Sequence, residues 1–217
     1  MQGDTIIIED HHRRAAARIA PFLLPKIRAA KKFTLTVAGE SGSGKSETAQ
    51  AIADELARLD SSISSVIFQQ DDYFVFPPKS NDRARREDLD WVGPQEVNLP
   101  LLDRHLAVFR RGQATLVKPL VSYDSDSIST EQIRMADARV AIAEGTYTTL
   151  LDNADCHIFI ARNYEDTRAH REKRKRSAAE LDPFIDSVLK IEHDIISAGK
   201  ERADIIISRD YDVEGLD

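Results

Sequence analysis

A glycine-rich segment carries the residues with the clearest potential for chemistry. Residues 39 to 46 read GESGSGKS, which matches the phosphate-loop pattern of glycine, four residues, glycine, lysine and serine or threonine. Glycines let backbone N–H groups approach phosphate oxygens closely, and the dipole of a following helix favours the same anion. The segment predicts a nucleoside triphosphate site, the alternative being a Gly/Ser turn with an exposed lysine. The residues expected to contact ATP are Gly39, Glu40, Ser41, Gly42, Ser43, Gly44, Lys45, Ser46 and Glu47.

Two side chains of this segment can act on the phosphates directly. Lys45 brings positive charge to the β- and γ-phosphates, and the hydroxyl of Ser46 can ligate Mg²⁺. The loop alone does not fix the reaction, because GTPases, motor ATPases and small-molecule kinases share it. The guanine-reading pattern Asn-Lys-x-Asp and the transporter-ATPase signature are absent from the sequence. Kinase chemistry is the simplest remaining interpretation.

Two adjacent carboxylates interrupt the apolar run VIFQQDDYFVFPP at residues 66 to 78. The carboxyl ends of parallel strands line the ligand crevice, so Asp71 and Asp72 would face the γ-phosphate. A kinase that phosphorylates an alcohol needs a carboxylate to orient the hydroxyl and accept its proton. Because neighbouring residues that leave a strand point to opposite sides, we expect only one of the two to serve.

The elements that must position these residues alternate along the chain. Short β-branched runs alternate with longer helical patterns, which predicts an α/β sheet. Several runs are apolar without alternation, as is typical of parallel strands covered on both faces. The predicted strands lie at residues 5–8, 33–38, 65–69, 139–144, 157–161 and 203–208, and the predicted helices at residues 45–59, 98–111, 164–177 and 182–200.

An N-terminal extension precedes this alternating part. Residues 1–32 are expected to form a strand and a basic helix, the helix being interrupted by Pro21 and Pro25. Such a helix could contact a membrane surface or a partner, or it could simply cap the core with a solvated basic face.

The remainder, residues 33–217, is expected to form a P-loop domain, and the whole chain a single compact domain. It contains an acceptor-side insertion at residues 76–125 and a lid at residues 164–180. The proline- and charge-rich segment at residues 76–95 is too long for an ordinary connection, so it is expected to be a functional lid or partly disordered.

Composition narrows the class of protein. The 217 residues suffice for one full-sized core, and 41% hydrophobic with 31% charged residues is typical of soluble globular proteins. The sequence shows no signal-peptide pattern and no membrane-spanning run, so the expected location is cytoplasmic, without a membrane partner. A net charge of −7 argues against binding nucleic acid. The expected partner is a small molecule, and a homo-oligomer would match the base rate for soluble enzymes.

Taken together, the motifs resemble the uridine kinase and phosphoribulokinase family of P-loop kinases, to which nicotinamide riboside kinases are related. The resemblance covers roughly residues 33 to 208 and implies a three-layer P-loop sandwich with a mainly parallel five-stranded sheet. The segments that carry it are GESGSGKS, QQDDYF, LDWVGPQEVNLPLLDRHL, PLVSYD, AIAEGTY and DTRAHREKRKR.

The resemblance implies roles for the matching residues. Asp71 would be the base and a metal contact, and Glu144 would hold Mg²⁺ together with Ser46. The basic run at residues 166–176 would be a lid over the triphosphate, whereas on its own it would more often be a solvated helix face. The implied catalytic groups are Lys45, Asp71, Arg171 and Arg174, and the implied acceptor contacts are Tyr73, Asp90, Trp91, Tyr123, Arg168 and Arg176.

The acceptor side departs from uridine kinases in three places. No histidine follows YDS, Trp91 stands where those enzymes have a histidine, and the lid ends in SAAELDP in place of Glu-Arg-Gly-Arg. The sequence thus predicts an ATP- and Mg²⁺-dependent kinase of the uridine kinase type, whose acceptor hydroxyl belongs to a nucleoside, sugar or polyol. A nucleotide-binding regulator without transfer activity and an RNA-binding protein are the alternatives, the second being disfavoured by net charge and by the lack of aromatics among the arginines.

Overall fold

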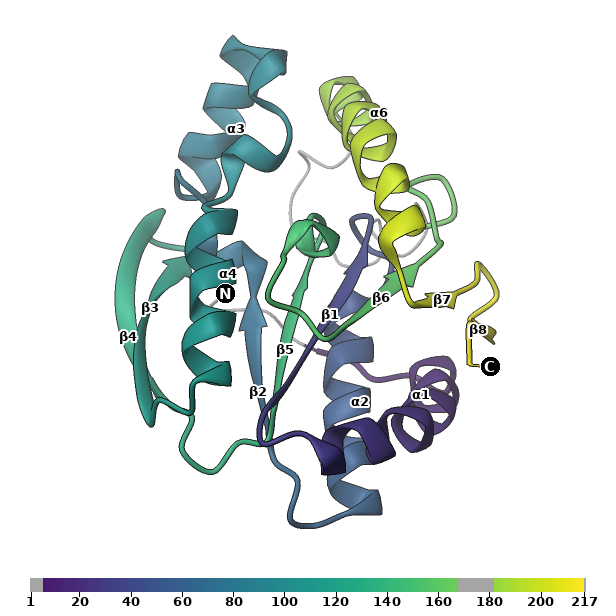
Figure 1. Cartoon of the computed structure of the whole chain (residues 1–217). Helices are drawn as coiled ribbons and strands as arrows, with labels where there is room; N and C mark the ends of the chain where they lie inside the picture. The colour runs from purple at the N-terminus through teal and green to yellow at the C-terminus, as the bar shows by residue number, and fades with distance from the viewer. Residues whose placement is uncertain (1–5, 168–181, 217) are drawn as a thin grey trace.

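A six-stranded sheet forms the centre of the computed structural model, which describes residues 6–167 and 182–216 (Figure 1). The strand order is β2-β5-β1-β6-β7-β8. The first five strands in this order are parallel, and the short β8 pairs antiparallel with β7. The predicted α/β fold with a mainly parallel sheet is confirmed, with β8 as an addition. The bounds are β1 (Phe33–Gly39), β2 (Ser65–Gln69), β5 (Val140–Gly145), β6 (Cys156–Ile160), β7 (Ile205–Ile207) and β8 (Val213–Glu214).

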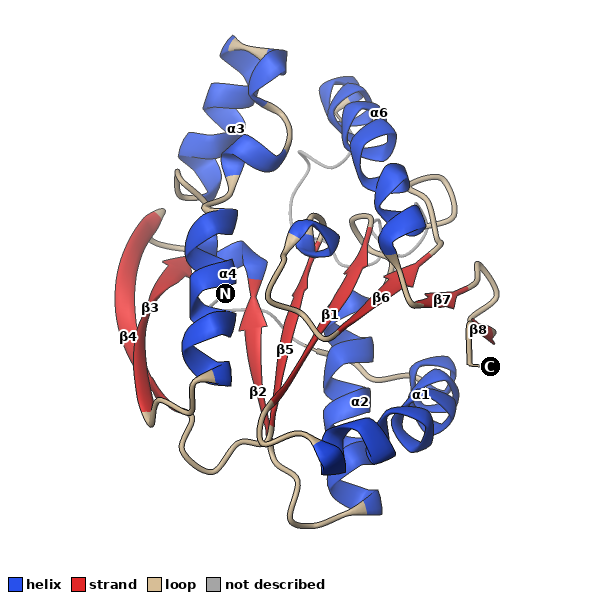
Figure 2. Cartoon of the chain, viewed as in Figure 1, coloured by secondary structure: helices blue, strands red, loops and turns tan. Residues whose placement is uncertain are grey.

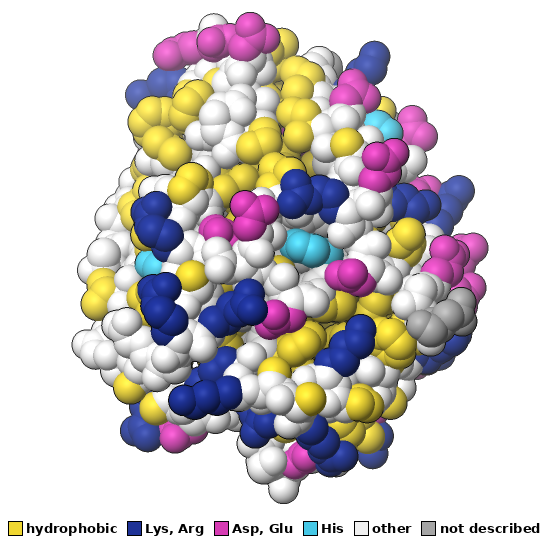
Figure 3. Space-filling model, in the orientation of Figure 1, with side chains coloured by type: hydrophobic (Ala, Val, Ile, Leu, Met, Phe, Trp, Pro, Cys, Tyr) yellow, Lys and Arg dark blue, Asp and Glu magenta, His cyan; other side chains and the backbone are white. Residues whose placement is uncertain are grey.

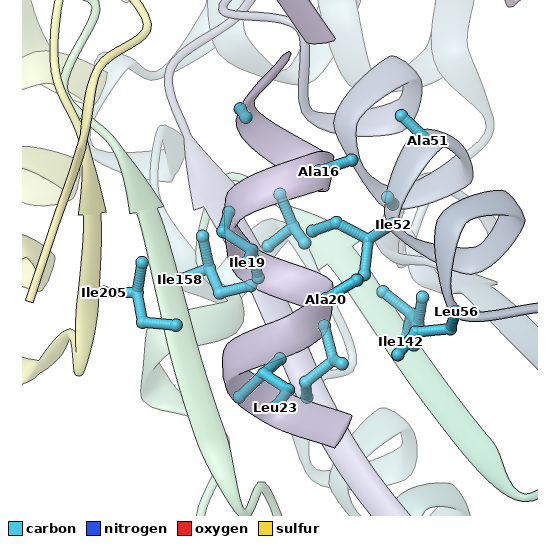
Figure 4. Packing of buried hydrophobic residues seen from close by; sticks show 14 of the residues in the cluster. Ala16, Ile19, Ala20, Leu23, Ala51, Ile52, Leu56, Ile142, Ile158 and Ile205 are labelled. Carbon is cyan, nitrogen blue, oxygen red and sulfur yellow. The ribbon is translucent and has the colours of Figure 1, made fainter. Parts of the chain in front are cut away.

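Helices cover both faces of the sheet and give a three-layer sandwich (Figure 2). On one face, α1 and α2 share a buried apolar cluster with β1, β5, β6 and β7. Figure 4 shows Ile19 and Leu23 of α1 beside Ile52 of α2 and the isoleucines of the sheet. On the other face, α4 and the end of α6 enclose a second cluster. The helices are α1 (Asp10–Ala29), α2 (Lys45–Leu59), α3 (Pro78–Glu87), α4 (Leu99–Arg110) and α6 (Pro183–Ile196).

The N-terminal extension differs from the prediction. The described residues of the predicted first strand, 6–8, are not in a strand, and α1 runs without interruption through Pro21 and Pro25. Both prolines lie on the exposed face of the helix, four residues apart. Leu23, between them, and Ile27, after them, are fully buried on the opposite face. Burial of the apolar stripe therefore outweighs the hydrogen bonds that the two prolines remove.

The acceptor-side insertion is more ordered than the sequence indicated. Residues 76–96 contain α3 and two short 3₁₀ helices, η2 (Leu89–Trp91) and η3 (Pro94–Glu96). An antiparallel hairpin, β3 (Thr115–Ser122) with β4 (Ser127–Arg134), forms a separate two-stranded sheet that was not predicted. Most of β4 is exposed and polar, so it lacks the apolar signal of a strand.

The predicted helices agree closely with the structure where they can be compared. α2 has the predicted bounds, α4 is one residue shorter at each end, and α6 is continued by the 3₁₀ helix η6 (Ser197–Arg202). Of the predicted helix at residues 164–177, residues 164–167 form a turn and the rest lie outside the described residues. No helix in the described part of the chain is long and apolar enough to cross a bilayer.

Candidate active site

The phosphate loop joins β1 to α2, as the GESGSGKS pattern predicts. Gly44 is the residue before α2 and has a φ of 94°, a left-handed conformation that favours glycine. A Cβ there would lie 2.2 Å from the hydroxyl of Tyr211 and 2.7 Å from Nε2 of His12. Tyr211 also donates to the carbonyl oxygen of Ser43 at 2.6 Å. Side chains from both ends of the described chain thus hold the back of the loop.

The hydroxyl of Ser46 and the carboxylate of Glu144 lie close together where the loop enters α2. Ser46 donates to Oε1 of Glu144 at 2.9 Å, because β5 lies next to β1 and carries Glu144 as its last residue but one. Burial raises the pKa of Glu144 to about 7, and the charge of Asp71 adds to this, while Lys45 and the Ser46 hydroxyl oppose it. Hard oxygen donors of this kind suit Mg²⁺, whose charge would favour the ionised carboxylate. Ser46 and Glu144 therefore fit a magnesium ion.

The adjacent aspartates lie in different surroundings on the 3₁₀ helix η1 (Gln70–Tyr73). Asp71 is half-buried, and its charge acts on Glu144. Asp72 is 2% exposed, accepts from Lys118 Nζ at 2.6 Å and accepts from the backbone N–H of Val121 at 3.1 Å. Asp72 thus ties the β3–β4 hairpin to η1, and Asp71 is left as the aspartate on the Glu144 side.

The sequence prediction that Tyr73 contacts the acceptor is wrong. Tyr73 is 1% exposed, and its hydroxyl shares a 2.8 Å hydrogen bond with Nδ1 of His105 on α4. Because its neighbour Asp72 is also buried, the 3₁₀ turn directs two consecutive side chains into the protein. Tyr73 belongs to the second apolar cluster and stabilises it.

The other predicted acceptor contacts lie on the insertion. Asp90 is exposed on η2, and the neighbouring Trp91 donates from Nε1 to Oδ1 of Asn81 at 2.9 Å and packs against Phe76 with ring centroids 5.3 Å apart. Tyr123 follows β3 and is 37% exposed. These side chains stay candidates for acceptor binding. Figure 3 shows hydrophobic side chains over the upper part of this face, with acidic, basic and histidine side chains near its middle.

The predicted lid is described only at its start. The four predicted lid arginines, Arg168, Arg171, Arg174 and Arg176, lie outside the described residues. Before them, Tyr164 N–H donates to Oε2 of Glu40 at 2.7 Å, and the Thr167 hydroxyl donates to the carbonyl oxygen of Ser41 at 3.0 Å. The first residues of the predicted lid are therefore bonded to the phosphate loop.

Sequence reasoning missed a group of charged residues that links the loop to the insertion. His193 of α6 shares a 2.6 Å hydrogen bond between Nδ1 and Glu40 Oε1, and its neighbour Glu192 accepts from Arg85 of α3 at 2.9 Å. Arg85 also donates to Glu96. One signal was available, because Glu192 falls on the buried face of α6 with Val188, Leu189 and Ile196, where a charge requires a partner. Arg85 and Glu96 have no comparable local pattern.

Comparison with known proteins identifies relatives along most of the chain. The phosphoribulokinase/uridine kinase family matches residues 34–214. The uridine kinase of Shewanella denitrificans is 29% identical over 185 residues, covering 80% of this chain and 85% of that enzyme. The uridine kinase of Ureaplasma parvum serovar 3 is 28% identical over 130 residues, covering 58% of this chain and 60% of that enzyme. The second alignment thus spans less than two thirds of the relative.

Solved structures show the same architecture. A candidate fructose transport system kinase from Silicibacter sp. TM1040 superposes with a TM-score of 0.61 at 16% identity, covering 86% of this chain and 93% of that one. At this identity the likeness shows the fold alone. Because the family match extends over far more than half of the sequence, the protein belongs to the phosphoribulokinase/uridine kinase family of P-loop kinases.

Proposed function

We propose that the protein transfers the γ-phosphoryl group of ATP to a hydroxyl of a small metabolite. The observation that carries this proposal is the meeting of Ser46, Glu144 and the charge of Asp71 at the carboxyl ends of β1, β5 and β2. In open parallel sheets this edge is where ligands bind. A loop suited to a triphosphate and a carboxylate suited to an acceptor hydroxyl therefore lie at the same edge of the sheet, which supports the proposal.

Each residue has a distinct part in the proposed transfer. The loop backbone and Lys45 bind the β- and γ-phosphates, and Ser46 and Glu144 hold Mg²⁺, which neutralises phosphate charge when it is bound. Asp71 accepts the proton of the acceptor hydroxyl as its oxygen bonds to the γ-phosphorus. The bond between that phosphorus and the bridging oxygen breaks, and ADP leaves with the bridging oxygen. Asp72 does not take this part, because its carboxylate is ion-paired with Lys118.

The proposed acceptor is a nucleoside, sugar or polyol, with the uridine kinase type first. Two relatives that align with this chain are named uridine kinase, at 28% and 29% identity. The residues that follow Tyr123 and the tryptophan at position 91 depart from the uridine kinase pattern, so the acceptor need not carry a pyrimidine.

The proposal is tested by incubating the purified protein with ATP, Mg²⁺ and a panel of nucleosides, sugars and polyols. ADP and phosphorylated product are recorded for each compound. We expect at least one compound to stimulate ADP formation and to appear as its phosphate ester. If ATP binds but no compound on the panel is phosphorylated, the protein is better described as a nucleotide-binding regulator of the kinase fold.

A further inference from the structure

The phosphate loop and the first turn of α2 carry more acidic than basic side chains. Residues 39–47 include the carboxylates of Glu40 and Glu47 and the single ammonium group of Lys45. Like charges repel one another, and the repulsion is stronger where water is excluded. A loop proposed to bind a triphosphate therefore requires that its acidic side chains be held away from the phosphates or that their charge be offset.

Glu40 is joined to the proposed phosphate-binding groups through its backbone. Its carbonyl oxygen accepts from Nζ of Lys45 at 2.9 Å and from the backbone N–H of Ser43 at 3.1 Å. The carboxylate of the same residue is separated from this carbonyl only by the length of its own side chain. That side chain is 6% exposed, so solvent ions screen its charge poorly. The direction in which the Glu40 carboxylate points therefore matters for the binding of phosphate.

The two oxygens of the Glu40 carboxylate have different partners, both outside the loop. Oε1 is 2.6 Å from Nδ1 of His193 on α6, and Oε2 accepts from the backbone N–H of Tyr164 at 2.7 Å. An ionised carboxylate only accepts hydrogen bonds, so Nδ1 of His193 is the donor in this pair. The rings of Tyr164 and His193 also pack edge to face, with centroids 5.8 Å apart. The carboxylate thus points toward α6 and the segment that follows β6.

α6 is fixed in place next to His193. The preceding residue, Glu192, accepts from Arg85 of α3 at 2.9 Å, and α6 lies beside the carboxyl end of β1, where the loop begins (Figure 1). An anchored helix presents the imidazole to the loop in a defined position. The His193 side chain is itself 36% exposed, so it can be replaced without opening a cavity in the core.

We propose that His193 is a positioning residue, which holds the Glu40 carboxylate away from the bound triphosphate and offsets part of its charge. The inference rests on the proposed function, because it concerns how the loop binds ATP. Hydrogen bonds to an ionised group are about twice as strong as those between neutral groups, so this pair fixes the direction of the side chain. Without the imidazole, the carboxylate keeps its bond to Tyr164 only, and its charge opposes the binding of the phosphates. His193 contacts neither nucleotide nor acceptor in this role and acts through Glu40.

The test measures the binding of a non-hydrolysable ATP analogue with Mg²⁺ by calorimetry, using variants of the whole chain. We expect His193→Ala to weaken the affinity about tenfold, the effect of losing one hydrogen bond to a charged group. His193→Asn should retain most of the affinity, because its amide places an N–H near the position of Nδ1. An affinity of His193→Ala equal to that of the wild-type protein would overturn the proposal.

Glu40→Gln separates an effect of charge from simple structural support. The amide oxygen can still accept from Tyr164, and the NH₂ group can donate to Nδ1 of His193 in its other tautomer. Because the negative charge is gone, the affinity for the analogue should not fall. Adding Glu40→Gln to His193→Ala should restore the affinity that His193→Ala loses. If the two side chains only support the shape of the loop, the double variant binds as weakly as His193→Ala or more weakly, and the proposal is wrong.

Arg28→Ala is the matched control. Arg28 of α1 forms an ion pair at 2.7 Å with Asp60, which follows the end of α2 that is remote from the phosphate loop. This variant also removes an ion pair between two segments, but it should leave the affinity for the analogue unchanged. An equal loss in the control would show that the affinity responds to any lost ion pair, against the proposal. The thermal midpoint of each variant is recorded, so that a loss of folded protein is recognised.

The outcomes separate this inference from the proposed function. If acceptors are phosphorylated but His193→Ala binds the analogue as well as the wild-type protein does, the inference is wrong and the function stands. If binding of the analogue follows the expected pattern but no compound is phosphorylated, the inference stands and the transfer function is wrong. If the wild-type protein does not bind the analogue, both are wrong.

Discussion

The proposed donor side and the proposed acceptor side of the site are built in different ways. Most of the proposed donor side comes from one continuous segment, in which the phosphate loop and the first turn of α2 supply backbone N–H groups, Lys45 and Ser46, and Glu144 of β5 is a proposed metal ligand from elsewhere in the chain. The proposed acceptor side comes from η1, α3, the β3–β4 hairpin and α6, which are joined by ion pairs of largely buried side chains such as Lys118 with Asp72 and Arg85 with Glu192. The proposed donor side therefore depends mainly on the local conformation of one loop, with support from distant residues such as Glu144 and Tyr211, whereas the proposed acceptor side depends on contacts between distant segments throughout.

We expect the largest difference between a catalytic and a structural residue at the adjacent pair Asp71 and Asp72. Asp71→Asn removes the proposed proton acceptor, so turnover should fall by roughly 10²- to 10⁴-fold with affinity for ATP retained. Asp72→Asn keeps an acceptor for the N–H of Val121 but breaks the ion pair with Lys118, so it should lower stability and change turnover less than tenfold. The measurements are steady-state kinetics and thermal unfolding of both variants. If Asp72→Asn loses turnover and Asp71→Asn does not, the assignment of the base is reversed.

Lys118→Met tests the proposed acceptor side alone, because it removes the ion pair between the β3–β4 hairpin and Asp72. It leaves the buried carboxylate of Asp72 without its cation, and breaking a buried pair in this way costs about 3 to 5 kcal/mol. We expect a lower free energy of unfolding in denaturant titrations, with the affinity for ATP unchanged. Arg134→Met is the control. Arg134 is the last residue of β4 and forms an exposed ion pair with Asp137, so its removal should lower the free energy of unfolding by less than about 1 kcal/mol. Equal costs for the two variants would contradict the structural role of Lys118.

Glu144→Gln should separate stability from activity on the donor side. The pKa of Glu144 is raised from its ordinary value of 4.5 to about 7, so the native state binds a proton more readily than the unfolded state does. Without Mg²⁺, the stability of the wild-type protein should therefore fall as pH rises from about 4.5 to about 7. The amide avoids this loss.

The predicted result is that Glu144→Gln and the wild-type protein differ little in thermal midpoint at pH 5, and that the variant is the more stable at pH 8 in Mg²⁺-free buffer. Its turnover should nevertheless fall about 10²-fold, the cost of losing one electrostatic group at a reacting phosphate. A variant that is less stable than the wild-type protein at pH 8 would show that Glu144 is not held at an electrostatic cost.

Sequence reasoning succeeded where structure is set locally. The strand, the glycine loop and α2 follow one another in the chain, so the position of the GESGSGKS loop and the bounds of α2 were predictable from a local pattern. The resemblance to the family pointed to Glu144, and its place next to the last residue of a buried parallel strand agrees, because such a carboxylate lies at the same edge of the sheet as the loop.

Features that depend on contacts between distant segments could not be predicted from the sequence. Tyr73 follows the base in the motif but faces His105 in the core, a direction set by the 3₁₀ turn and by packing against α4. The bond between Arg85 and Glu192 joins residues 107 positions apart, which no local pattern encodes. Pro21 and Pro25 lie inside a continuous helix because the buried stripe of α1 packs on α2 and the sheet. In each case the outcome is decided by contacts between segments that are distant in the sequence.

The most direct test of the account is a stoichiometric one. Wild-type protein and Asp71→Asn are incubated with ATP, Mg²⁺ and the best acceptor from the panel, and ADP, inorganic phosphate and phosphorylated acceptor are measured together. The account predicts that the wild-type protein forms one phosphorylated acceptor for each ADP, and that Asp71→Asn binds ATP but forms neither product at a comparable rate. ADP accompanied by inorganic phosphate alone, at a rate that no acceptor changes, would contradict it.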